Sequence, residues 1–355
     1  MISVLLLLVG LAVLVFAAEL FVRGASSLAS RLGVSALIVG LTVVAFGTSA
    51  PELAVSLSAV ADNKPDLAVG NVVGSNIFNV LFILGLTALI SPLVVHQKLV
   101  RVDVPLMIAA SGILWLMCLD GRLGRAEGAA LFAGIIGYSV LAVVLARRES
   151  AAVRAEYAEA DRATPTQPVW RLVALLLGGL IGIVLGARWL VQGATGIATA
   201  LGVSDLVIGL TIVAAGTSLP EVATSVVAAL RGHRDIAVGN VVGSNIFNIL
   251  CILGATGLLA PGGLPVPDGL LAFDLPVMFA VCVACLPVFA AGHDISRYEG
   301  AMLLLGYLAY TGYLVLDSTG HDHLTDIPAV TLWIALPLAA IGVVGASVRW
   351  IRGGR

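Results

Sequence analysis

A short motif that occurs twice places one carboxylate among hydroxyl groups in each copy. It reads GTSAPE at residues 47–52 and GTSLPE at residues 216–221, so the two carboxylates are Glu52 and Glu221. Carboxylate and hydroxyl oxygens are ligands of hard cations such as Ca²⁺, which takes about 6–8 oxygen atoms. Gly and Pro within one motif also break or distort a helix. The motif therefore predicts a cation site beside an interrupted helix.

A second repeated motif supplies amide and hydroxyl oxygens. It reads GNVVGSNIFN at residues 70–79 and again, letter for letter, at residues 239–248. Neither motif contains His, Cys or Met, whose nitrogen and sulfur atoms transition metals favour. Two carboxylates carry a charge that one Ca²⁺, two Na⁺ or two protons would balance. Amides also serve helix packing in membranes, and this interpretation stays open for the first two Asn residues of each copy.

The composition places these motifs in a membrane protein. Of the 355 residues, 59% are hydrophobic and 11% are charged, whereas soluble domains carry roughly 25% charged residues. Residues 67–95 and residues 236–267 contain no charged side chain at all, and a spanning helix needs about 20 apolar residues. The net charge of −2 gives no basic surface for nucleic acid. We therefore expect a polytopic protein whose surroundings are the lipid bilayer.

Eleven apolar segments are predicted to span the membrane. The first lacks a basic region before it and carries Glu19, so we interpret it as a span and not as a signal peptide. The predicted spans are residues 2–22, 36–60, 67–91, 102–119, 126–146, 170–191, 205–229, 236–260, 270–290, 298–316 and 329–350.

The distribution of Lys and Arg predicts the orientation of these spans. With the N-terminus outside, fifteen of the nineteen basic residues fall in cytoplasmic segments, as the positive-inside rule requires. The polar linker at residues 146–168 and the C-terminus would then both be cytoplasmic. The chain is expected in the cell (inner) membrane.

An internal repeat predicts the architecture. When the sequence is shifted by 169 residues, 30 of the 46 positions from Gly40 to Gly85 match those from Gly209 to Gly254. Each repeat contains five spans, and because five is odd the two copies cross the membrane in opposite senses. Such inverted repeats are typical of secondary transporters, with the site near the midplane. The expected fold is all-α, with ten core transmembrane helices in two inverted five-helix repeats and an eleventh C-terminal helix.

The repeat also sets the domain boundaries. The four predicted parts are the first membrane repeat at residues 1–146, a cytoplasmic linker at 147–168, the second membrane repeat at 169–316, and an outer loop with the extra helix at 317–355.

Other features were weighed against this interpretation. Cys282 and Cys285 form a CxxC pair, but without a second ligand pair we interpret them as small buried apolar residues. The acidic and His-containing loop at residues 316–326 is interpreted as solvated, with an outer metal site as the alternative. An intramembrane hydrolase lacks a nucleophile–base pair here. A cation channel would use the same oxygens as a filter, but the inverted repeat argues against it.

The paired motifs resemble the repeats of the cation/calcium exchanger superfamily, in its prokaryotic sodium/calcium exchanger (antiporter) branch, over about residues 1–316. The resemblance implies that the protein exchanges Ca²⁺ for Na⁺ by alternating access. It implies no enzymatic activity. It implies no cofactor besides these transported ions, and no protein partner is predicted. It places Ca²⁺ on Glu52, Glu221, Thr48 and Thr217. It places Na⁺ on Ser49, Ser75, Ser218 and Ser244, with Asn79 and Asn248 beside the centre.

Two departures from related branches bear on the coupling ion. Asn79 and Asn248 are both amides, where some relatives carry one Asp, and this removes a possible third carboxylate. The second motif of the proton-coupled branch typically resembles Gly-Asn-x-x-Glu. In this chain Gly74 and Gly243 occupy the position of that Glu. Both departures favour Na⁺ as the driving ion, while H⁺-coupled or K⁺-dependent calcium antiport remain the alternatives.

Overall fold

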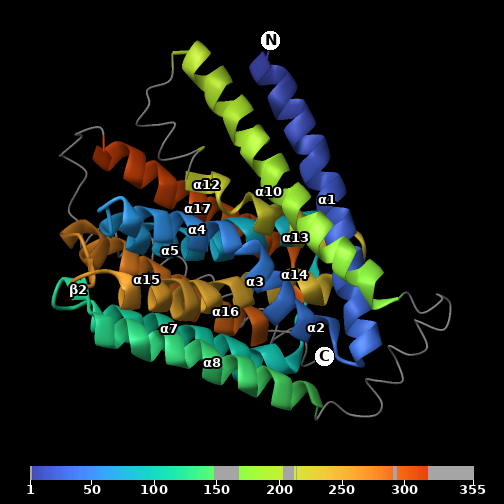
Figure 1. The fold of residues 1–355 in the computed structure, drawn as a ribbon, viewed down its shortest axis with the longest axis horizontal. Helices are drawn as coiled ribbons and strands as arrows, with labels where there is room; N and C mark the ends of the chain where they lie inside the picture. The colour runs from blue at the N-terminus through green and yellow to red at the C-terminus, as the bar shows by residue number, and fades with distance from the viewer. Residues whose placement is uncertain (1, 148–167, 203–211, 213, 291–293, 319–355) are drawn as a thin grey trace. The chain divides into compact units, whose positions relative to one another are not determined.

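The computed structural model describes residues 2–147, 168–202, 212, 214–290 and 294–318. These residues are predominantly helical (Figure 1). Nine of the described helices are long and apolar enough to cross a membrane. In the predicted seventh span, the described residues include the three-residue helix Ala214–Gly216 and the shorter apolar helix Leu219–Leu230. The predicted eleventh span and most of the linker lie outside the described residues.

The helices of the first half follow one another with short interruptions. They are α1 (Ile2–Leu32), α2 (Ala36–Val39), η1 (Gly40–Val44), α3 (Ala45–Thr48), α4 (Ala50–Ala61), α5 (Asp66–Phe78), η2 (Asn79–Leu84), α6 (Gly85–Ile90), η3 (Leu99–Asp103), α7 (Val104–Met117) and α8 (Arg125–Arg147).

The second half repeats this order. Its helices are α10 (Val169–Ala200), α12 (Ala214–Gly216), α13 (Leu219–Leu230), α14 (Arg234–Phe247), η5 (Asn248–Leu253), α15 (Gly254–Leu259), η6 (Leu270–Asp274), α16 (Leu275–Ala290) and α17 (Arg297–Ser318). Two antiparallel pairs of two-residue strands complete the described structure: β1 (Leu93–Val94) with β4 (Asp294–Ile295), and β2 (Arg122–Leu123) with β3 (Leu264–Pro265).

The ends of most helices agree with the predicted spans to within a few residues, but α1 and α10 are longer than predicted. The predictions of 2–22 and 170–191 stopped where polar residues begin, whereas both helices continue to Leu32 and Ala200. Small residues and Arg after the apolar run remain compatible with a helix, because a long helix can tilt and its charged side chains can reach the membrane surface.

Segments of π-helix interrupt several spans, a feature that the sequence analysis did not predict. Two of them, η2 and η5, begin at Asn79 and Asn248, the equivalent last residues of the two copies of the second motif. A π-turn adds one residue to a helical turn and is frequent at functional sites. The identical sequences therefore adopt the same local irregularity in both repeats.

The chain forms two compact units, which interleave along the sequence. Unit 1 comprises residues 1–51 and 136–244, and unit 2 comprises residues 52–135 and 245–355. This division follows spatial packing and cuts through α4, α8 and α14. The repeat boundaries derived from the sequence stay predictions.

In unit 1, α1 and α10 lie side by side along much of their length (Figure 1). Glycines bring the two backbones together: a Cβ atom at Gly186 would lie 2.5 Å from the backbone nitrogen of Leu14, and one at Gly179 would lie 2.7 Å from that of Phe21. Gly178 does not take part in this contact, because a Cβ there would meet no described atom within 4 Å.

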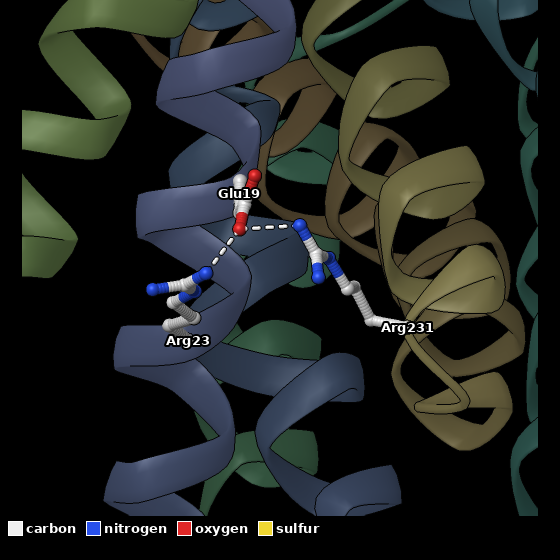
Figure 2. A network of polar contacts seen from close by, with 3 residues as sticks. All are labelled: Glu19, Arg23 and Arg231. Atoms are coloured by element: carbon white, nitrogen blue, oxygen red, sulfur yellow. Dashed lines mark hydrogen bonds and ion pairs between the residues drawn. The ribbon is translucent and has the colours of Figure 1, made fainter.

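An ion-pair network also joins α1 to the end of α13 in unit 1 (Figure 2). The carboxylate of Glu19 contacts the guanidinium groups of both Arg23, one turn along α1, and Arg231, which caps the C-terminus of α13. The cation at Arg231 also lies at the negative end of that helix, where a positive charge is favourable.

In unit 2, α6 packs on α17 and α7 packs on α16. Gly85 and Gly300 permit the first contact, because a Cβ on either residue would lie within 2.9 Å of the other's carbonyl oxygen. Stacked and edge-on aromatic rings, including Phe78, Phe82 and Tyr307, lie where α5 and η2 meet α17. Both strand pairs also belong to this unit.

Candidate functional site

The GTS-x-P-E motif interrupts its helix as the sequence predicted. In the first copy α3 ends at Thr48, and Ser49 adopts φ −81° and ψ 3° before α4 begins at Ala50. In the second copy Ser218 has a similar conformation, φ −90° and ψ 5°, and Pro220 lies in the first turn of α13. Proline is tolerated there because the first turn lacks an internal acceptor for its missing N–H.

In unit 1 the first copy donates its hydroxyl groups to residues of the second. Oγ of Ser49 donates to Oε1 of Glu221 at 3.1 Å, and Oγ1 of Thr48 donates to Oδ1 of Asn240 at 3.1 Å. The side chains of Thr48, Ser49 and Glu221 are all buried. The structure thus brings Thr48 and Ser49 into one hydrogen-bonded cluster with Glu221, which lies 172 residues after Ser49 in the sequence.

Asn240 of α14 fixes the position of Glu221 on α13. Its Nδ2 donates to Oγ of Ser225 at 3.0 Å and to the carbonyl oxygen of Glu221 at 3.4 Å, while its oxygen accepts from Thr48. The Nδ2 group and the Oδ1 atom of Asn240 are thus both engaged in hydrogen bonds within the protein. This geometry supports a positioning role for Asn240 rather than a direct contact with an ion.

The same arrangement occurs one repeat earlier, in unit 2. Nδ2 of Asn71 donates to Oγ of Ser56 at 3.0 Å and to the carbonyl oxygen of Glu52 at 3.3 Å. Glu52 is fully buried. The serine four residues after each Glu was missed by the sequence analysis, although it recurs in PELAVS and PEVATS and could have been found from the repeat.

Four buried asparagines of α5, η2 and α14, η5 form a second cluster, wholly within unit 2. Nδ2 of Asn79 donates to Oδ1 of Asn245, and Nδ2 of Asn248 donates to Oδ1 of Asn76, both at 3.0 Å. Nδ2 of Asn76 lies 3.4 Å from the carbonyl oxygen of Asn245, and Nδ2 of Asn245 lies 3.5 Å from that of Asn76. Each hydrogen bond therefore has a counterpart in the other repeat.

Several predicted ligands keep an oxygen atom that has no hydrogen-bond partner among the described residues. An unpaired buried polar group costs about 1–3 kcal/mol, so each such atom in a native protein requires an explanation. The predicted ligands concerned include, by atom, Glu221 Oε2, Thr217 Oγ1, Ser244 Oγ, Asn79 Oδ1 and Asn248 Oδ1. All are oxygens, and this is the donor chemistry that hard cations require.

The remaining predicted ligands have defined places. Ser75 is buried in α5 of unit 2, Ser218 is buried at the start of α13 in unit 1, and Ser244 is buried in α14. Glu52 belongs to unit 2 and Glu221 to unit 1. The loop at 316–326 falls almost entirely outside the described residues. Among those described, no group of three or more His, Cys, Asp or Glu side chains forms a metal cluster.

Comparison with known proteins identifies the family. A sequence model of the family described as sodium/calcium exchanger protein matches residues 2–144 and 171–316. The chain belongs to the sodium/calcium exchanger family. It is 41% identical, over 90% of its length and 100% of the relative's, to a putative antiporter, CaxA, of Alkalimonas amylolytica. It is 37% identical to the inner membrane protein YrbG of Escherichia coli, covering 87% of this chain and 95% of that one.

A solved structure of the sodium-calcium exchanger NCX_Mj shares the fold. It superimposes with a TM-score of 0.75 at 32% sequence identity, and the match covers 88% of this chain and 99% of that one. Family membership and the apolar helices together establish a multi-pass, all-helical membrane protein. The family consists of transporters and not of enzymes, which confirms that expectation from the sequence.

Proposed function

We propose that this protein exchanges Ca²⁺ for Na⁺ across the inner membrane by alternating access. The observation that carries the proposal is that several predicted ligands each keep a buried oxygen atom without a hydrogen-bond partner among the described residues, and one of these atoms is the carboxylate oxygen Oε2 of Glu221. A bound cation would supply the interactions that these atoms lack. The relatives named as an antiporter and a sodium-calcium exchanger support the same reaction.

The proposed ligands divide between the two ions. Ca²⁺ is bound by the two carboxylates and the threonine four residues before each, and Na⁺ by the serines of both motifs. The proposed set is Glu52, Glu221, Thr48 and Thr217 for Ca²⁺, Ser49, Ser75, Ser218 and Ser244 for Na⁺, and Asn79 and Asn248 beside the centre. Asn71 and Asn240, which donate to the carbonyl oxygens of Glu52 and Glu221, hold these backbones in place.

Charge balance explains why the two ions exchange. Two carboxylates compensate either one Ca²⁺ or two Na⁺, so the ions compete for overlapping oxygens. An empty site leaves two uncompensated charges in a medium of low dielectric constant, where a lone carboxylate costs at least about 2.5–3.5 kcal/mol. The switch between outward and inward access is therefore favoured only when an ion is bound, and this suppresses uncoupled leak.

The moving elements in this proposal are α1 and α10. Their contact in unit 1 relies on glycine and backbone atoms. With the N-terminus outside and the linker and C-terminus in the cytoplasm, as the basic residues indicate, α1 and α10 enter the membrane from opposite sides.

The test is ⁴⁵Ca²⁺ uptake into proteoliposomes loaded with Na⁺, beside liposomes loaded with K⁺ or choline, or holding only a pH gradient. We expect uptake that requires internal Na⁺ and is abolished by Glu52→Gln and by Glu221→Gln. Glu127→Gln is the matched control, because Glu127 caps α8 through the amide of Gly124 and is outside the proposed set. Uptake that follows the pH gradient, or K⁺ alone, would contradict Na⁺ coupling. Non-saturable flux without counter-ion would indicate a channel.

A further inference from the structure

We propose that Asn76 and Asn245 are positioning residues, which hold the amide groups of Asn248 and Asn79 so that their oxygen atoms, and not their N–H groups, face the transported cation. The inference rests on the proposed function for the identity of the cation. It adds two residues, outside the proposed ligand set, that decide how the ligands Asn79 and Asn248 are presented.

The first step is the fixed orientation of Asn245. Its Nδ2 lies 3.5 Å from the carbonyl oxygen of Asn76 and 3.6 Å from Sδ of Met107 on α7. Neither atom can donate a hydrogen bond, since a carbonyl and a thioether only accept. Rotating the amide by half a turn would bring its oxygen against both acceptors. The oxygen of Asn245 must therefore point the other way.

The second step passes this orientation to Asn79. Oδ1 of Asn245 accepts from Nδ2 of Asn79 at 3.0 Å. The oxygen of Asn79 consequently points away from Asn245, and it is buried without a hydrogen-bond partner among the described residues. An amide with N–H groups toward a cation would repel it, whereas the oxygen is a ligand that Ca²⁺ and other hard cations accept.

The mirror of this relay runs in the opposite sense between the repeats, from Asn76 to Asn248. Nδ2 of Asn76 lies 3.4 Å from the carbonyl oxygen of Asn245 and 3.7 Å from Sδ of Met278 on α16. Oδ1 of Asn76 accepts from Nδ2 of Asn248 at 3.0 Å, and this leaves Oδ1 of Asn248 buried and without a partner in the described structure. Because each relay begins at a backbone carbonyl, neither amide can rotate without losing several hydrogen bonds.

The relay explains why positions 76 and 245 carry an amide. A carboxylate there would accept from Asn79 or Asn248 but could not donate to the facing carbonyl and thioether. An aspartate at position 79, in contrast, would present an oxygen in either orientation, because its two oxygens are equivalent. Orientation control is needed only for an amide ligand, and this distinction separates a positioning role from a purely structural one.

The experiment measures stabilisation of the purified full-length protein by Ca²⁺ alone and by Na⁺ alone, as the shift in unfolding temperature across a cation titration. We expect Asn245→Leu to raise the half-saturating Ca²⁺ concentration about 10-fold, because the amide of Asn79 is then free to turn its oxygen away from the ion. In the Asn79→Asp background, the same substitution should not weaken Ca²⁺ binding. Asn76→Leu, alone and with Asn248→Asp, repeats the test in the mirror relay. Ser111→Ala on α7 is the control, since its hydroxyl donates to the carbonyl oxygen of Ile108 in its own helix and takes no part in the relay.

The outcomes separate this inference from the proposed function. If Asn245→Leu weakens Ca²⁺ binding equally with Asn79 and with Asp at position 79, or leaves it unchanged, the positioning role is overturned while exchange is untouched. If Asn245→Leu alone does not fold, Asn76→Leu with and without Asn248→Asp makes the same comparison in the mirror relay. If neither cation stabilises the wild-type protein, no bound ion faces the amides, and both the inference and the proposed function fall.

Discussion

The contact between α1 and α10 in unit 1 and the asparagine cluster in unit 2 hold helices together by opposite means. Between α1 and α10, glycines let backbone approach backbone, and the ion pair that extends from this region runs from Glu19 to Arg231 on α13. In the asparagine cluster, four amides bond one another and two backbone carbonyls. Dispersion is non-directional, whereas a hydrogen bond fixes distance and angle.

This difference indicates which region can move and which must stay. A contact made by glycines and apolar side chains, such as that between α1 and α10, can shift along the helices without exposing an unpaired polar group. A cluster of buried amides cannot shift without leaving several donors and acceptors unpaired, at about 1–3 kcal/mol each. Four changes test this comparison.

The largest effect is expected from a substitution that adds a side chain to the glycine contact between α1 and α10. Gly186→Ala places a Cβ atom 2.5 Å from the backbone nitrogen of Leu14, and backbone cannot give way as a flexible side chain can. We expect a loss of about 1–3 kcal/mol in unfolding free energy and near-complete loss of exchange. Gly178→Ala, where a Cβ meets no described atom within 4 Å, should behave as wild type. Equal behaviour of the two variants, measured by denaturation and ⁴⁵Ca²⁺ flux, would refute the role of this contact.

Removal of a polar positioning residue should have the next largest effect. Asn240→Leu leaves Ser225 and the carbonyl of Glu221 without their shared donor. We expect more than about 10-fold slower exchange, following the cost of unpaired buried groups. Thr256→Val is the control, because that hydroxyl donates only to carbonyl oxygens of the preceding turn, in η5, among the described contacts. An Asn240→Leu protein that exchanges as fast as Thr256→Val would show that Glu221 needs no such support.

A smaller effect is expected from the ion pair between α1 and α13. Arg231→Gln removes a link to Glu19, so α1 should move more easily, and the maximal exchange rate should rise about 2- to 5-fold at low salt with an unchanged half-saturating Ca²⁺ concentration. The expected rise in rate is modest because exposed ion pairs contribute only about 0–1 kcal/mol. High salt should remove the difference in rate between Arg231→Gln and the wild-type protein. Arg23→Gln, which breaks only the pair within α1, is the control. A slower Arg231→Gln protein, or an equal effect of Arg23→Gln, would contradict this link.

The smallest effect is expected at the thioether acceptors. Met278→Leu keeps the volume near Asn76 but removes a weak acceptor at 3.7 Å, while the carbonyl of Asn245 continues to fix the amide. The half-saturating Ca²⁺ concentration should change less than about 2-fold, because volume-conserving core changes are well tolerated. A larger change in a cation titration would mean that sulfur, and not the backbone, sets the orientation.

Much of the fold was predictable because apolar runs and helix-breaking motifs are local features. Helices α5 and α14 begin within two residues of their predicted starts, and the break at Ser49 follows from Gly47 and Pro51 beside it. The π-turns at Asn79 and Asn248 were not predicted, since no residue type specifies them. Nor were the extensions of α1 and α10, where the hydropathy pattern ends before the helix does.

The sequence by itself determined the class of protein, the internal repeat and the oxygen chemistry of the two motifs, because composition, self-similarity and side-chain type are written in the chain. Only the tertiary structure decided what each amide does. Asn76 and Asn79 have the same side chain and lie three residues apart, yet one is bonded on both sides and the other keeps a buried oxygen without a partner among the described residues. The partners that make this difference come from the other repeat, and their distances are set by packing rather than by local sequence.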